Sequence, residues 1–141
     1  MPQIRCVLGM VGIDPHNKGI RTLARRLRDE GVEVIYVGEH NTPDEMFRVA
    51  VDEDAHLVGV SFSTSNYSET IQMLLAARRR QGAEDVQLIV GGLIHPDHEQ
   101  HLLDLGVAGV FGPGTSIADV VALFSRLYPD LELRDGRTAP K

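Results

Sequence analysis

The sequence has 141 residues, of which 43% are hydrophobic and 24% charged, and its formal net charge is −6. This length allows one domain with a sizeable core and is too short for two ordinary domains. The acidic balance argues against nucleic acid as the main partner, because binding to a phosphate backbone needs a basic face. No apolar run approaches the roughly 18 residues of a membrane span, and no signal-peptide pattern opens the chain.

The single cysteine, Cys6, falls within the first expected strand, where a small buried core residue is the simplest interpretation. One cysteine permits no disulfide within the chain, which fits a reducing compartment. We therefore expect a cytoplasmic protein with no membrane partner.

Five short apolar runs alternate with segments of helical periodicity. The runs predict strands over 4–9, 32–37, 57–61, 86–90 and 107–111. The helices between and after them are expected over 21–30, from residue 42, up to residue 82, over 96–105 and over 117–127. Residues 1–128 then form the domain, and the polar residues 129–141 form an expected loose tail.

Two of the expected helices carry end signals. Gly31 follows the first helix, in the position of a C-terminal glycine cap. Thr42 is expected to cap the second helix, with Pro43 in its first position and Glu45 completing a capping box.

The strands are apolar throughout, which indicates burial on both faces and hence a parallel sheet with helices on both sides. Right-handed crossovers make a doubly wound sheet the natural closure. We expect an α/β fold of the flavodoxin-like kind, a five-stranded parallel sheet in the order 2-1-3-4-5. The loops after strands 1, 3, 4 and 5 would then meet at one edge and line one crevice.

The loop after the first strand contains Asp14, His16 and Gly19. A lone loop histidine is usually just exposed to solvent. An aspartate two residues earlier favours another interpretation, because a carboxylate commonly orients a metal-bound imidazole through its far ring nitrogen. A glycine at position 19 would let a ligand or a neighbouring backbone come close.

The loops after the later strands carry small residues. Ser61 ends the third strand within a hydroxyl-rich stretch and would bond a polar ligand, although Ser65 or Ser68 in that stretch can equally cap a helix. The pair Gly91-Gly92 ends the fourth strand, either as a tight exit or as bare backbone against a flat ligand group. Gly112-Pro113-Gly114-Thr115 repeats this theme after the fifth strand, where Thr115 or Ser116 is also a plausible helix cap.

These motifs also have a characteristic spacing. There are 41 residues between Gly19 and Ser61, and 27 between Ser63 and Gly91. The pattern Asp-x-His-x-x-Gly, then a Ser-x-Leu-like element, then Gly-Gly, resembles the cobalamin-binding domain of the acyl-CoA mutases, of which methylmalonyl-CoA mutase is the best-known member. The resemblance extends from Ile4 to about Leu127 and includes 111–115.

The resemblance implies a role for each motif residue. His16 would replace the cofactor's own dimethylbenzimidazole below cobalt, and Asp14 would orient that histidine. The displaced nucleotide tail would thread between the first helix and the sheet. Eight positions of this sequence fall in the motifs that bind the tail in the family. They are Gly19, Ser61, Ser63, Gly91, Gly92, Gly112, Gly114 and Thr115.

The chain departs from the family pattern at three positions. Pro15 stands between the aspartate and the histidine, where the family often has glycine. Met10 stands where mutases typically carry a lysine bonded to the aspartate, a role for which Lys18 is a candidate. Ser63 replaces the leucine of the Ser-x-Leu element, and we expect a more polar tail pocket as a result.

The resemblance implies that the chain is the cobalamin-binding small subunit of an adenosylcobalamin-dependent acyl-CoA mutase. The implied reaction is a 1,2 rearrangement of an acyl-CoA carbon skeleton. It is started when the cobalt–carbon bond breaks homolytically and the deoxyadenosyl radical abstracts a substrate hydrogen. A separate TIM-barrel large subunit would bind the acyl-CoA, and the small chain alone is expected to be inactive.

Other classes of protein share the motif or the fold. A cobalamin carrier or sensor would keep the motif and lack a barrel partner. A methyltransferase corrinoid protein usually has a helical cap domain before this motif, and we do not expect one here because three residues precede the first strand. A phosphoacceptor receiver domain needs an aspartate where Ser61 stands and a lysine where Gly112 stands, and a flavodoxin needs more aromatic residues. For His95, His98 and His101, a solvated helix start is a better interpretation than a zinc site.

Overall fold

The computed structural model describes residues 3–12, 18–64, 66–131 and 133. The strands are β1 (Arg5–Val11), β2 (Glu33–Asn41), β3 (Leu57–Phe62), β4 (Gln87–Gly92) and β5 (Gly109–Phe111). The helices are α1 (Lys18–Asp29), α2 (Pro43–Asp52), α3 (Tyr67–Arg80), α4 (Glu99–Leu105) and α5 (Ile117–Leu127), with a 3-10 turn, η1 (Pro96–His98), before α4.

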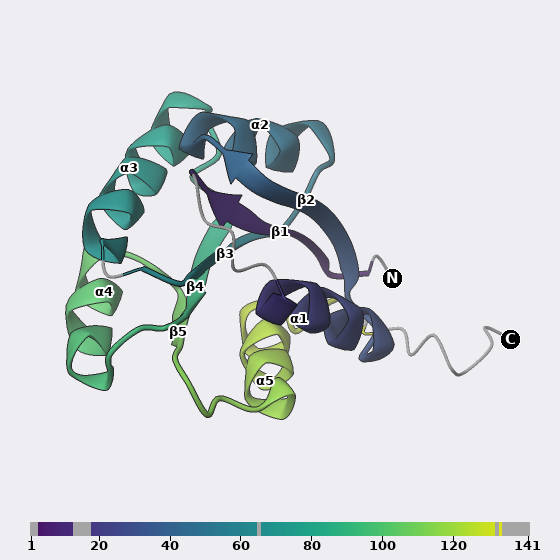
Figure 1. Cartoon of the computed structure of the whole chain (residues 1–141). Coiled ribbons are helices and arrows are strands. Elements are labelled where there is room, and N and C mark those ends of the chain that lie inside the picture. The colour runs from purple at the N-terminus through teal and green to yellow at the C-terminus, as the bar shows by residue number, and fades with distance from the viewer. Residues whose placement is uncertain (1–2, 13–17, 65, 132, 134–141) are drawn as a thin grey trace, which may run out of the picture.

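The strands form one parallel sheet in the order β2-β1-β3-β4-β5, which confirms the expected topology. Helices α1 and α5 lie together on one face of the sheet, while α2, α3 and α4 cover the other (Figure 1). The carboxyl ends of β1, β3, β4 and β5 therefore meet at one edge, as the sequence predicted.

Each face of the sheet has its own hydrophobic core, because successive side chains of a strand point to opposite faces. In β1, Val7 belongs to the core beneath α2 and α3, whereas Cys6, Leu8 and Met10 belong to the core beneath α1 and α5. Cys6 is fully buried, as expected, and burial raises the pKa of its thiol to about 12.

The capping residues of α2 agree with the sequence. The Thr42 hydroxyl accepts a hydrogen bond from the Glu45 backbone N–H at 3.1 Å, and the Glu45 carboxylate accepts one from the Thr42 N–H at 3.1 Å. At α5, Ser116 is the cap, paired with Asp119. The alternative cap, Thr115, instead donates its hydroxyl to the Gly112 carbonyl at 2.8 Å.

The start of α3 differs from expectation. Its N-cap is Asn66, which makes no side-chain capping hydrogen bond. Ser68 lies inside the first turn of the helix, so it is not the cap, and Ser65 falls outside the described residues.

β2 is longer than the sequence predicted and runs on to Asn41. The side-chain amide of Asn41 donates to the carbonyl oxygens of Met10 at 3.0 Å and Gly38 at 2.8 Å. The N–H of Gly12 donates to the Asn41 carbonyl at 3.0 Å. These bonds hold the end of β1 against β2 up to the start of the loop that follows.

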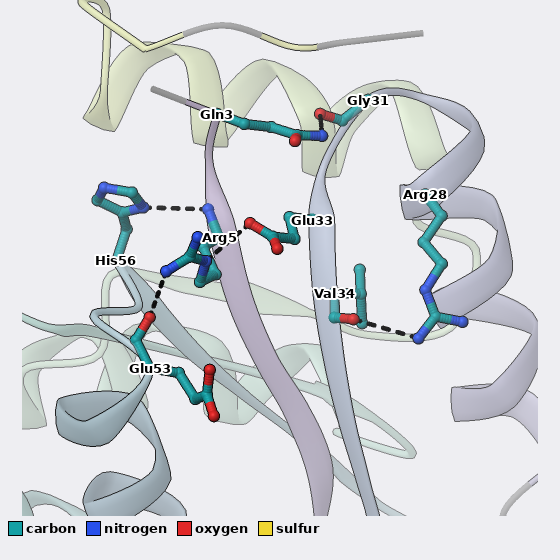
Figure 2. A network of polar contacts seen from close by, with 8 residues as sticks. All are labelled: Gln3, Arg5, Arg28, Gly31, Glu33, Val34, Glu53 and His56. Carbon is teal, nitrogen blue, oxygen red and sulfur yellow. Dashed lines mark hydrogen bonds and ion pairs between the residues drawn. The ribbon is translucent and has the colours of Figure 1, made fainter. Parts of the chain in front are cut away.

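A network of polar contacts lies at the amino ends of β1 and β2, at the opposite edge of the sheet (Figure 2). Arg5 pairs with Glu33 at 2.7 Å and reaches the Glu53 carbonyl, while its backbone N–H donates to His56 Nδ1 at 3.0 Å. These groups bond to one another at the edge away from the motif loops, so we assign them a structural role.

The chain stays packed beyond α5. The Tyr128 hydroxyl donates to the His56 carbonyl at 2.6 Å, and Leu131 and Leu133 pack against the core beneath α1 and α5. The division between domain and tail after residue 128 stays a prediction. Within the described ranges, no helix is long and apolar enough to cross a membrane.

Candidate functional site

A pocket of about 140 Å³ lies between the sheet and the pair α1 and α5. Its walls come from four strands, the two helices and the loop after β5. The lining residues are Leu8, Leu23, Leu27, Gly59, Val60, Ser61, Ile89, Val90, Gly91, Gly92, Phe111, Gly112, Thr115 and Val120. The pocket therefore lies toward the carboxyl ends of the strands, beside the point between β1 and β3 where the strand order reverses. Doubly wound folds bind small molecules in this region.

Glycine in the middle of β3 contributes to this hollow. A Cβ atom at Gly59 would lie 2.8 Å from Leu8 Cδ1 and 3.4 Å from Ile89 Cγ1. Sequence reasoning did not single out Gly59. The available signal was a glycine within the apolar run of β3, which often marks a close approach of a ligand or another chain segment.

Two polar side chains interrupt the otherwise apolar lining. Thr115 is already hydrogen-bonded to the Gly112 carbonyl. Ser61 is the second-last residue of β3 and lies on the same face as Gly59, and among the described residues its hydroxyl has no hydrogen-bond partner. Ser61 is therefore the side chain best able to bond a polar group of a bound molecule.

Neighbouring backbone carbonyl groups leave no space for a side chain at Gly91 or Gly92. A Cβ atom at Gly92, whose φ is +101°, would lie 2.1 Å from the Phe62 carbonyl oxygen. A Cβ atom at Gly91 would lie 2.9 Å from the Phe111 carbonyl oxygen. The tight-exit interpretation thus accounts for both glycines, and the same bare backbone also lines the pocket.

The pocket gathers only part of the expected site. It includes Ser61, Gly91, Gly92, Gly112 and Thr115. It does not include Gly19, which is exposed in the first turn of α1, nor Gly114 or Ser63. The polar effect expected of Ser63 on the pocket is therefore not visible in the lining.

The motif residues Asp14, Pro15 and His16 lie outside the described residues. The two other positions noted beside them are described. Met10 is fully buried in the core beneath α1 and α5, so its apolar side chain is part of the packing. Lys18 begins α1 and is exposed.

The histidines after β4 belong to a separate cluster on the α3 and α4 side. The Tyr67 hydroxyl and His98 Nδ1 share a hydrogen bond, and the backbone N–H of His95 donates to the Tyr67 hydroxyl oxygen at 3.4 Å. In the part of the chain that the structure describes, no three His, Cys, Asp or Glu side chains are placed to hold a metal ion.

The fold and the pocket define a class: a doubly wound α/β domain with a small, largely apolar pocket at the carboxyl edge of its sheet. Residues 4–122 match the family model described as the B12 binding domain. The chain belongs to this family, and it is a cobalamin-binding domain related to the subunits of acyl-CoA mutases. The resemblance inferred from the motif spacing is confirmed.

The curated relatives include both short and long chains. The 2-hydroxyisobutanoyl-CoA mutase small subunit of Aquincola tertiaricarbonis is 36% identical over 107 residues, which cover 76% of this chain and 79% of that subunit. Methylmalonyl-CoA mutase of Escherichia coli is 34% identical over 126 residues, which cover 86% of this chain. The match spans only 18% of that mutase, and similarly 20% of an ethylmalonyl-CoA mutase of Cereibacter sphaeroides.

Solved structures share the fold at low sequence identity. A cobalamin-binding protein from Desulfitobacterium hafniense superposes with a TM-score of 0.74 at 20% identity, covering 88% of this chain and 58% of that one. The receiver domain of the response regulator NarL from Mycobacterium tuberculosis gives a TM-score of 0.64 at 17% identity, covering 90% and 98%. The fold alone therefore does not separate cobalamin binders from receivers.

Proposed function

We propose that this chain binds adenosylcobalamin with its nucleotide tail in the pocket, as the small subunit of an acyl-CoA mutase. The observation that carries the proposal is the pocket itself. An apolar cavity of about 150 Å³ holds a benzene-sized molecule in other proteins, and this one measures about 140 Å³. Its mainly apolar wall and glycine backbone suit a flat aromatic base such as the one that ends the tail.

The chain's own residues would hold the cofactor in distinct ways. The Ser61 hydroxyl would bond a polar group of the tail, and the backbones of Gly91 and Gly92 would allow its close approach. His16 would be the lower ligand of cobalt, oriented by Asp14. The remaining motif positions proposed to contact the tail or its loops are Gly19, Ser63, Gly112, Gly114 and Thr115.

The cofactor, when bound, supplies the radical chemistry of a 1,2 rearrangement of an acyl-CoA carbon skeleton. This chain would position the cofactor, and a TIM-barrel large subunit would bind the acyl-CoA substrate. The match to a small subunit along 79% of its length supports this division of labour. The chain alone would then have no mutase activity.

The test is the electron paramagnetic resonance spectrum of the full chain with reduced cobalamin. We expect a nitrogen splitting that changes when histidine is labelled with nitrogen-15 and that disappears in His16→Ala. His101→Ala, which removes an exposed histidine of α4, is the matched control and should keep the splitting.

Identical spectra for the parent chain and His16→Ala, with no histidine-dependent splitting, would contradict the assignment of His16. Activity of the chain on an acyl-CoA without any second protein would contradict its role as a small subunit. A cobalamin carrier or sensor, the alternative function, would bind the cofactor without forming an active complex with a mutase large subunit.

A further inference from the structure

A second concave site lies between α1 and the edge strand β2. It is a groove of about 380 Å³, and it shares no lining residue with the cofactor pocket. Its lining residues are Arg21, Ala24, Arg25, Arg28 and Tyr36. The site therefore combines three guanidinium groups from a helix with one phenol from a strand.

The three arginines form one stripe along α1. Positions 21, 25 and 28 are four and three residues apart, so their side chains emerge on the same helix face. All three are exposed. Across the described ranges, none of the three side chains forms an ion pair. Within those ranges, only the Arg28 side chain has a hydrogen bond, which its guanidinium donates to the Val34 carbonyl at 3.2 Å (Figure 2).

The stability of α1 does not explain this stripe. Like charges four residues apart on a helix repel each other. Arg21 is also close to the helix N-terminus, where the helix dipole favours negative charge, and the first turn has no acidic residue. Only Arg28, in the last turn, is placed favourably for the dipole. The concentration of charge is notable in a chain whose net charge is −6.

Tyr36 adds an observation that points to a ligand. Its side chain lines the groove, and its hydroxyl oxygen is buried with no hydrogen-bond partner among the described residues. A buried hydroxyl without a partner is unfavourable, and most such groups in folded proteins are bonded. A small movement of the Tyr36 ring toward the groove would let an acceptor oxygen of a bound molecule satisfy it.

We propose that this groove binds a ligand with an oligophosphate group. Guanidinium forks bind phosphate oxygens in pairs, which suits three arginines facing one groove. The stripe from Arg21 to Arg28 extends about 10 Å along the helix axis. This length favours a chain of two or three linked phosphates over a single phosphate ion. The phenol of Tyr36 donates to one of the phosphate oxygens.

The test is calorimetric titration of the full chain with inorganic triphosphate, pyrophosphate and orthophosphate at low ionic strength. We expect affinity to fall in that order. Arg25→Gln should weaken triphosphate binding at least about tenfold, and Tyr36→Phe several-fold. The matched control is Arg48→Gln, which removes the same charge from an exposed position of α2 and should leave the affinity unchanged.

Absence of triphosphate binding would overturn the proposal. It would also be overturned by equal losses in Arg25→Gln and Arg48→Gln, which would indicate only a general effect of net charge. Because the groove and the cofactor pocket share no lining residue, either result leaves the cobalamin proposal standing.

Discussion

Gly92 and Phe62 meet at the carboxyl edge of neighbouring strands, where the N–H of Leu93 donates to the Phe62 carbonyl at 2.8 Å. The same carbonyl oxygen lies 2.1 Å from the point that a Cβ atom at residue 92 would occupy. Any side chain at this position therefore requires the exit of β4 to move, and β4 forms part of the pocket wall.

We expect Gly92→Ala to lower the free energy of unfolding by about 3 kcal/mol or more, because backbone strain at positive φ adds to the clash. Gly114→Ala is the control, since its φ of +87° is also positive but no atom lies within 4 Å of its Cβ position. It should lose only about 1 kcal/mol. Urea denaturation measures both, and equal losses would show that the contact with Phe62 is unimportant.

Filling the pocket should separate binding from folding. Ser61→Leu places an apolar side chain in the space proposed for the nucleotide tail. We expect it to fold normally and to bind cobalamin at least about tenfold more weakly, a difference of ~1.4 kcal/mol. Equilibrium dialysis measures this affinity.

The matched control is Ser125→Leu, the same change at an exposed position of α5 away from the pocket lining. It should bind cobalamin as the parent chain does. Unaltered binding by Ser61→Leu would mean that the tail lies elsewhere.

His56 gives the stability of the chain a pH dependence. Burial lowers the pKa of this imidazole below its ordinary value of 6.5, and the neutral ring accepts a hydrogen bond from the Arg5 N–H. The unfolded chain therefore binds a proton at His56 more readily than the folded chain. Its contribution to stability is complete above about pH 6.5 and is lost as the pH falls through and below that value.

We expect the free energy of unfolding to fall as the pH drops below about 6.5, and this slope to flatten in His56→Gln. His101→Gln, which changes an exposed histidine, should keep the slope of the parent chain. Denaturant titrations at several pH values measure it. A slope that is the same in all three proteins would contradict the role of His56.

The fold could be predicted because the apolar runs of the strands and the helical segments repeat in a regular order. The end of β2 could not, since its extension depends on the side-chain bonds of Asn41 to the distant Met10 and to Gly38. A sequence shows that an asparagine is present but not which carbonyl groups it meets.

The pocket lining was predictable where small residues follow the strands. Ser61 and Gly91 line the pocket as the doubly wound topology implies. Gly59 was missed because its role depends on Leu8 and Ile89 from neighbouring strands. Gly91 was open to two interpretations because a glycine required by a nearby carbonyl and one required by a ligand look the same in a sequence. The roles of Asp14 and His16 stay predictions.

The most direct test of the central claim compares cobalamin with cobinamide, the corrinoid that lacks the nucleotide tail. If the tail occupies the pocket between α1 and the sheet, the chain should bind cobalamin at least about tenfold more tightly than cobinamide. The preference should disappear in Ser61→Leu. Equal affinities of the parent chain for the two corrinoids would contradict the account.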